Sequence, residues 1–199
     1  MLLDTDSYAF TLSDVSYQTT CAAPGYIAPE VLKLMETTGV GDFESLAAST
    51  NAPVFTPQTD DFGLAVHIFK MLNRGIHPYA SGELDLEIFE LDDDDIPPAP
   101  SLNSCVCNGR SPFVGTLVGY VVPEYALELD DFGGLMGEAF RRSLYGRAEE
   151  RLDARTWARL LDRYLSETVV CQRRGHLYHA SQHECPYCRG EHALLARLG

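Results

Sequence analysis

The sequence predicts a mainly α-helical protein that is built around one buried helix and ends in a small segment rich in cysteine and histidine. Three observations lead to this prediction. Residues 59–81 hold a strongly apolar helical stretch, residues 127–144 and 152–165 repeat apolar side chains at helical spacing, and cysteines gather with histidines in residues 171–188. A chain of 199 residues, 45% of them apolar, can bury one sizeable core and carry a small appendage.

The predicted central helix lies within residues 59–81. A helix that is apolar nearly all round lies inside a domain, and this one is too short and too often charged to span a bilayer. Its apolar residues are Phe62, Leu64, Ala65, Val66, Ile68, Phe69, Met71 and Leu72. Thr59 is the expected N-cap and Asp60 lies in the first turn, while Gly75 and Pro78 mark the end.

The other elements are expected in the following order. Residues 11–20 are polar and predict a loop, and Pro29 suits the first turn of a helix that continues through Leu34. A short helix is expected near residues 43–48, within a longer connection. Residues 82–108 are acidic and proline-rich, which predicts an irregular surface insertion, and residues 111–122 suit a hairpin or an extended segment.

The charge of the chain limits its partners. A net charge of −14 argues against binding to nucleic acid, and the acids concentrate in residues 83–95. Neither a secretion signal nor an apolar run long enough for a membrane span is present, so no membrane contact is expected and the expected location is the cytoplasm.

Short motifs in this order resemble protein kinases. Residues 24–32 read Pro-Gly-Tyr-Ile-Ala-Pro-Glu-Val-Leu, as at the end of a kinase activation segment, and Asp60-x-Phe62-x-x-Ala65 matches the start of the buried kinase helix. Residues 3–8, 61–69 and 77–80 resemble one bacterial group more closely, the helix-hairpin-helix proteins with a protein kinase domain. The resemblance covers roughly residues 2–190 and implies a partial kinase C-lobe over residues 1–168.

The resemblance also implies roles for single residues. Asp4 stands where kinases hold Mg²⁺ against ATP, and Asp6 occupies the neighbouring glycine position, so either acid is a candidate for binding Mg-ATP. A solvated N-terminus is the alternative for both. Glu30 would form a buried ion pair with Arg151, and Asp60 would accept hydrogen bonds from a catalytic loop. Asp60 could equally be an ordinary first-turn acid that interacts with the helix dipole.

The sequence lacks a glycine-rich loop, a strand lysine and a His-Arg-Asp catalytic loop. We therefore expect the C-terminal part of a bacterial Ser/Thr-type protein kinase that is inactive alone and binds Mg-ATP only together with the missing N-terminal half. The alternative is a non-catalytic, pseudokinase-like scaffold module that binds a protein partner. No motif in the sequence identifies the protein substrate.

The C-terminal cluster predicts a structural zinc site in residues 169–190. A Cys-x-x-Cys knuckle with one upstream cysteine and one histidine can complete a tetrahedral zinc site. The expected ligands are Cys171, His176, Cys185 and Cys188, with His179 and His183 as substitutes for His176.

Overall fold

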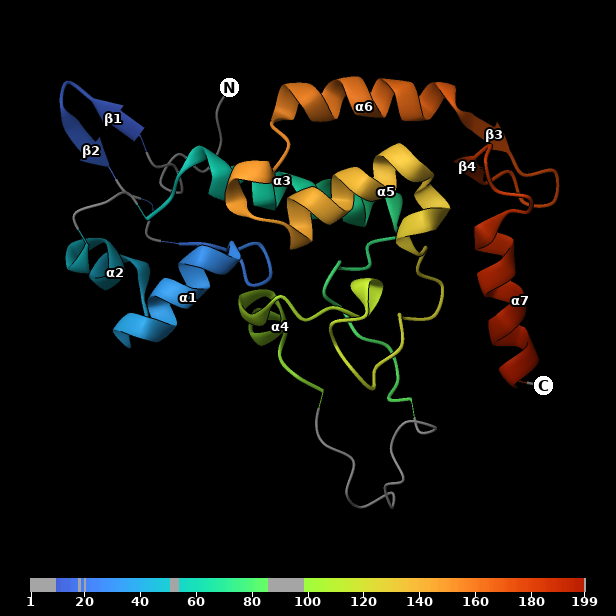
Figure 1. The fold of residues 1–199 in the computed structure, drawn as a ribbon, viewed down its shortest axis with the longest axis horizontal. Helices are drawn as coiled ribbons and strands as arrows, with labels where there is room; N and C mark the ends of the chain where they lie inside the picture. The colour runs from blue at the N-terminus through green and yellow to red at the C-terminus, as the bar shows by residue number, and fades with distance from the viewer. Residues whose placement is uncertain (1–9, 18, 20, 51–53, 86–98, 199) are drawn as a thin grey trace, which may run out of the picture.

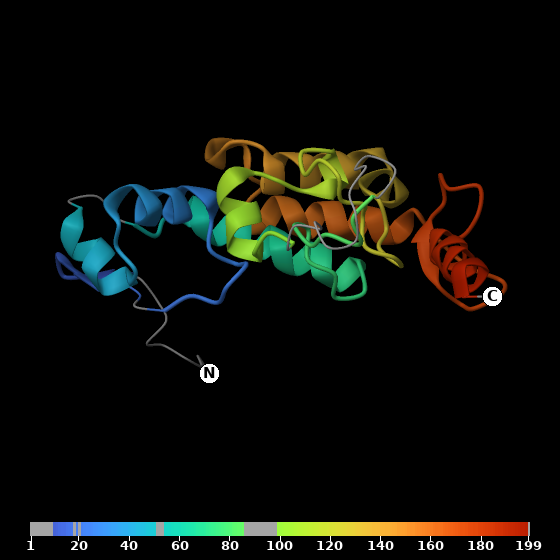
Figure 2. The ribbon, with the colours of Figure 1, turned by 90° about the horizontal axis from the view of Figure 1, so that it is seen from below.

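The structure is a computed structural model that describes residues 10–17, 19, 21–50, 54–85 and 99–198. Helices make up 51% of the described residues and strands very little, so the predicted mainly α class is confirmed. Figures 1 and 2 show an elongated molecule with α1 and α2 at one end, α3, α5 and α6 in the middle, and α7 at the other end. Asp4 and Asp6 lie outside the described residues.

The N-terminal part is a hairpin and not the loop that its composition predicts. Strands β1 (Phe10–Leu12) and β2 (Val15–Tyr17) pair antiparallel, and the rings of Phe10 and Tyr17 stack 4.8 Å apart. The two turn residues, Ser13 and Asp14, have φ of 49° and 65°. Two successive left-handed residues form the tight turn that matches the twist of paired strands.

Two short helices follow. Helix α1 (Pro29–Thr38) begins with proline at its first position and ends at Gly39, whose φ of 68° is the left-handed conformation of a helix C-cap. Helix α2 (Phe43–Ser49) is capped by Asp42, which accepts a hydrogen bond from the Ser45 backbone N–H. Both helices form where the sequence predicts them.

The central helix α3 (Pro57–Leu72) begins three residues earlier than expected. Its N-cap is Thr56 and not Thr59; the two threonines form a capping box in which each side chain binds the other's backbone N–H. Phe62, Ala65, Val66 and Phe69 are fully buried, whereas Met71 is 83% exposed. The helix is therefore central; its buried apolar face reaches Phe69 in the last turn, and Met71 lies on the exposed side.

The region predicted as an irregular insertion contains a helix at its end. Helix α4 (Leu102–Asn108) is capped by Ser101 and ends at Gly109, and its buried residues are Cys105, Val106 and Cys107. It packs against α1. Residues 111–122 do not form a hairpin with each other; they contain the 3₁₀ turn η3 (Pro112–Val114), and Tyr120 pairs with Leu84 in an isolated bridge.

The late helices complete the core around α3. They are η4 (Leu129–Phe132), α5 (Gly134–Phe140), the π-helix η5 (Arg141–Tyr145), η6 (Ala148–Glu150) and α6 (Ala154–Ser166). Phe69 of α3 contacts the rings of Phe113, Phe132 and Phe140 at 5.1–5.8 Å, and Phe140 contacts Trp157 at 5.3 Å. This aromatic cluster joins segments from the middle and the end of the chain into one core.

The C-terminal segment consists of two short strands and a helix. Strands β3 (Thr168–Val170) and β4 (Leu177–His179) pair antiparallel, and α7 (Pro186–Leu198) continues past residue 190. Within the described part of the chain, none of the helices combines the length and the apolar composition that a bilayer crossing requires.

Candidate metal centre and ion pair

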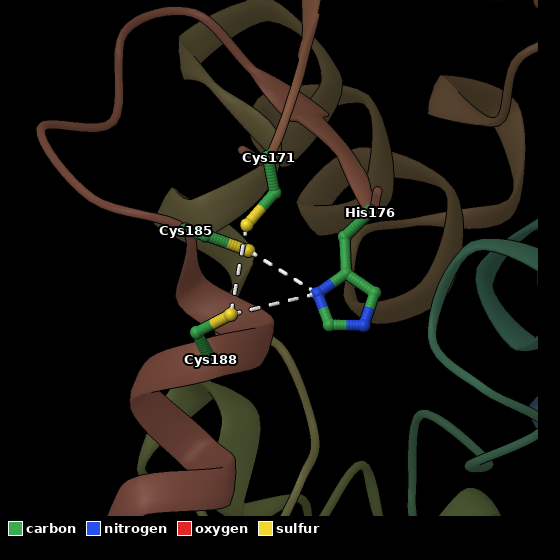
Figure 3. A group of neighbouring side chains, drawn as sticks. All are labelled: Cys171, His176, Cys185 and Cys188. Carbon is green, nitrogen blue, oxygen red and sulfur yellow. Dashed lines mark hydrogen bonds between the residues drawn. The ribbon is translucent and has the colours of Figure 1, made fainter. Parts of the chain in front are cut away.

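Cys171, His176, Cys185 and Cys188 converge on one point at the start of α7 (Figure 3). Their ligand atoms all lie within 4.8 Å of one another. The Sγ atoms of Cys171 and Cys188 are 3.6 Å apart, and Nδ1 of His176 lies 3.4 Å and 3.7 Å from the Sγ atoms of Cys185 and Cys188. Tetrahedral zinc requires about 3.8 Å between sulfurs and about 3.6 Å between sulfur and nitrogen. The cluster could hold a metal ion, and its geometry is consistent with zinc.

Two local turns bring the four ligands together. Cys171 follows β3 and begins a tight turn in which its N–H donates to the carbonyl of His176, and its own carbonyl accepts from Gly175 N–H, each at 2.8 Å. Gly175 has a φ of 71°. Cys185 and Cys188 are placed by the first turn of α7, where Arg189 N–H donates to the Cys185 carbonyl at 3.1 Å.

The thiols differ in their electrostatic surroundings. Hydrogen bonding from the Arg174 backbone N–H lowers the pKa of Cys171 to about 7, whereas burial raises the pKa of Cys188 to about 11. Metal binding requires all three thiols as thiolates, so it releases protons and weakens as the pH falls. Four protein ligands fill a tetrahedral shell and leave no position for a reacting water, which is typical of a structural site.

His179, a possible substitute ligand, belongs to a different set of contacts. Its Nδ1 lies 2.7 Å from Ser181 Oγ and its Nε2 lies 3.2 Å from Glu167 Oε2, while its ring stacks on Tyr164 at 5.7 Å. Its ring also lies against Gly133, where an added Cβ would come within 2.6 Å of an imidazole atom. The other substitute, His183, is exposed and is not among the four converging residues.

Glu30 and Arg151 form a two-pronged ion pair. The two guanidinium Nη atoms donate to the two carboxylate oxygens at 2.7 Å each. Arg151 also donates to the Gln58 carbonyl at 2.8 Å, and its guanidinium lies 5.2 Å from the centre of the Phe62 ring. The Arg151 side chain is 3% exposed and that of Glu30 is 40% exposed. Arg151 directly follows η6. Through it, the pair joins the first turn of α1 to the first two turns of α3.

Asp60 lies in the first turn of α3 on an exposed side. Among the described residues it forms no ion pair, and partial burial raises the pKa of its carboxyl. Asp60 therefore takes no part in the Glu30–Arg151 ion pair and is not one of the four residues of the Cys/His cluster.

Two polar sites were missed by the sequence analysis. Asn73, at the end of α3, is fully buried; its Nδ2 donates to the Leu127 carbonyl at 3.0 Å and its Oδ1 accepts from the Leu127 N–H at 2.7 Å. Asp131 is 5% exposed and accepts two hydrogen bonds from Arg189 at 2.7 Å and 2.8 Å. The sequence offered a signal only for Asn73, which is a polar residue at the end of a largely apolar helix.

The arrangement thus offers four potential metal ligands at one end of a helical body and a half-buried ion pair near the other. No protein-family model, curated protein or solved structure matches the chain.

Proposed function

We propose that this chain is the C-terminal part of a bacterial Ser/Thr-type protein kinase, a partial large lobe with a structural zinc site at its C-terminal end. The observation that carries the proposal is the Glu30–Arg151 ion pair. The kinase resemblance selects these two residues although they are 121 positions apart in sequence, and they are joined by two hydrogen bonds of 2.7 Å. A buried α3 that packs against the late helices is also what a kinase lobe requires.

In this role the chain positions a substrate-binding segment and does not perform phosphoryl transfer alone. The helix that begins at Pro29 holds the end of the activation segment, and Asp60 faces a catalytic loop that this sequence does not contain. Gripping the ATP phosphates and activating a substrate hydroxyl require the glycine-rich loop, the lysine and the catalytic base of the N-terminal half. By resemblance, Asp4 or Asp6 binds Mg-ATP once that half is present, and the assembly is cytoplasmic.

The zinc site supports the lobe and takes no part in the reaction. Three thiolates and one imidazole are the ligands that zinc prefers, and all four are supplied by the protein.

The proposal is tested by phosphorylation assays with radiolabelled ATP on casein-type substrates. The isolated chain should transfer no phosphate to itself or to the substrate. The reading frame upstream of Met1 should encode a glycine-rich loop, a lysine and a His-Arg-Asp loop, and the joined protein should lose activity in Asp4→Ala more than in Asp6→Ala.

Two results would contradict the proposal. Robust phosphorylation by the isolated chain that disappears in Asp4→Ala would show that the missing elements are not needed. An upstream frame without those elements would instead favour a non-catalytic scaffold module that binds a protein partner.

A further inference from the structure

Helix α7 carries two kinds of residue on its first two turns. Cys185, directly before α7, and Cys188 belong to the Cys/His cluster, and Tyr187, Arg189 and Glu191 contact the helical body of the protein. We call the interactions of these last three residues the docking contacts. Ligands and docking contacts therefore alternate along the same short stretch of chain.

Tyr187 connects the metal ligand His176 with the end of the central helix. The two rings lie 5.1 Å apart, and the Arg74 guanidinium lies over the Tyr187 ring at 4.6 Å. The Tyr187 hydroxyl donates to the backbone carbonyl of Leu72, the last residue of α3, at 3.0 Å. Glu191 adds a contact to Arg74 at 3.6 Å.

Arg189 connects the same helix with η4. Its guanidinium binds both carboxylate oxygens of Asp131, whose side chain is 7% exposed. Asp131 also accepts a hydrogen bond from the Glu128 N–H at 3.0 Å, which closes the first turn of η4. Without Arg189, this buried carboxylate would have no cationic partner among the described residues.

The two connections meet in the core. Leu127 directly precedes Glu128, the N-cap residue of η4. Asn73, which directly follows α3, binds both the backbone N–H and the carbonyl of Leu127. The docking contacts therefore reach one continuous structure, formed by the end of α3 and residues 127–131.

The segment around the metal cluster has little apolar support of its own. Its buried cluster consists of the three cysteines, with only Tyr178 and Tyr187 packed against it. A segment of this size with so small a core folds through a metal ion or through packing on a larger body.

We propose that metal binding at the Cys/His cluster is coupled to the stability of the whole helical body through the docking contacts. Bound metal would then stabilise the end of α3, and loss of the metal would destabilise it. The proposal rests on the zinc site proposed above. By linkage, any stability that metal confers on the body must be matched by an equal gain in metal affinity from the docking contacts.

Trp157 gives a direct test because it is the single tryptophan of the chain and is buried in the core beside Phe140, outside the metal segment. Thermal unfolding is followed by Trp157 fluorescence in zinc-loaded protein and after removal of zinc with EDTA. We expect zinc removal to lower the Trp157 midpoint by about 5 °C or more.

Arg189→Gln removes the contact with Asp131 without touching a metal ligand. This variant should still bind one equivalent of zinc, with an affinity about tenfold weaker, and EDTA should shift its Trp157 midpoint less than in the wild type. Arg173→Gln is the matched control, because Arg173 is an exposed arginine of the same segment; its zinc affinity and EDTA shift should equal those of the wild type.

Tyr187→Phe provides a second variant if Arg189→Gln does not fold, since it keeps both ring contacts and loses only the hydrogen bond to Leu72. It should show the same changes to a smaller degree. One equivalent of zinc with an unchanged Trp157 midpoint after EDTA would overturn the coupling and leave the zinc site standing. Failure of the wild type to bind zinc would overturn both.

Discussion

Glu30→Ala gives the sharpest test of the ion pair, because its two partners differ in burial. Breaking a fully buried pair costs about 3–5 kcal/mol and breaking an exposed pair about 0–1 kcal/mol. Arg151 is 3% exposed and Glu30 is 40% exposed, so the pair lies between these limits. We expect Glu30→Ala to cost about 2–3 kcal/mol, because it leaves the buried guanidinium with only the Gln58 carbonyl.

Arg151→Ala should cost a similar amount or slightly more. It leaves a carboxylate that can reach water, but it also removes the hydrogen bond to Gln58 and the contact with the Phe62 ring. These two losses are worth about 1 kcal/mol each. For a protein of this size, each kcal/mol corresponds to about 2–4 °C in melting temperature, so both variants should melt about 4–12 °C lower.

The assay is a double-mutant cycle measured by thermal and urea unfolding. The double variant should be about 2 kcal/mol more stable than the sum of the single losses predicts, since each single change already breaks the pair. The exposed pair of Arg163 and Glu167, which has a similar distance of 2.9 Å, is the control and should show a far smaller coupling. Additive losses in the Glu30–Arg151 cycle would refute the assignment of a structural role to this pair.

Three further predictions concern other described residues. Burial lowers the pKa of His77 from 6.5 to about 4, so its contribution to stability is fully present above pH 6.5 and is lost as the pH falls from 6.5 to about 4. The free energy of unfolding, measured in urea, should fall less steeply over this pH range in His77→Gln than in the wild type. Parallel curves for the two proteins would contradict the reasoning. Asn73→Ala should cost about 2–4 kcal/mol in urea unfolding, because the two polar groups of Leu127 lose their partner, whereas the exposed Asn108→Ala should change little. Metal analysis should find one equivalent of zinc in His179→Ala and much less in His176→Ala; equal contents would argue against His176 as a ligand.

Local signals in the sequence were enough for the metal ligands and for most helices. The Cys-x-x-Cys knuckle requires only the first turn of α7, so its spacing predicts its geometry. Pro29 and Asp42 likewise stand at the helix starts that they favour. The sequence analysis preferred His176 to His179, and the structure agrees: His176 joins the three cysteines, whereas His179 contacts Ser181 and Glu167.

Other features depend on contacts that a local pattern does not contain. Helix α4 is short and follows an acidic, proline-rich stretch, so its apolar residues become recognisable as core only when α1 covers them. The hairpin of β1 and β2 turns on two residues with positive φ, neither of them glycine, which removed the usual turn signal. The pairing of Asn73 with Leu127 spans 54 positions and requires the finished core.

The close approach of Gly133 to His179 restricts how the C-terminal segment can be exchanged between proteins. Gly133 has φ of 78° and ψ of 159°, a backbone conformation open almost only to glycine, and a side chain there would also displace the imidazole ring. A chimaera that grafts residues 168–198 onto another helical body would need glycine in the same conformation at the receiving turn. Residues 168–198 therefore fit the helical body of this protein, and they would not transfer unchanged to a body that lacks such a glycine.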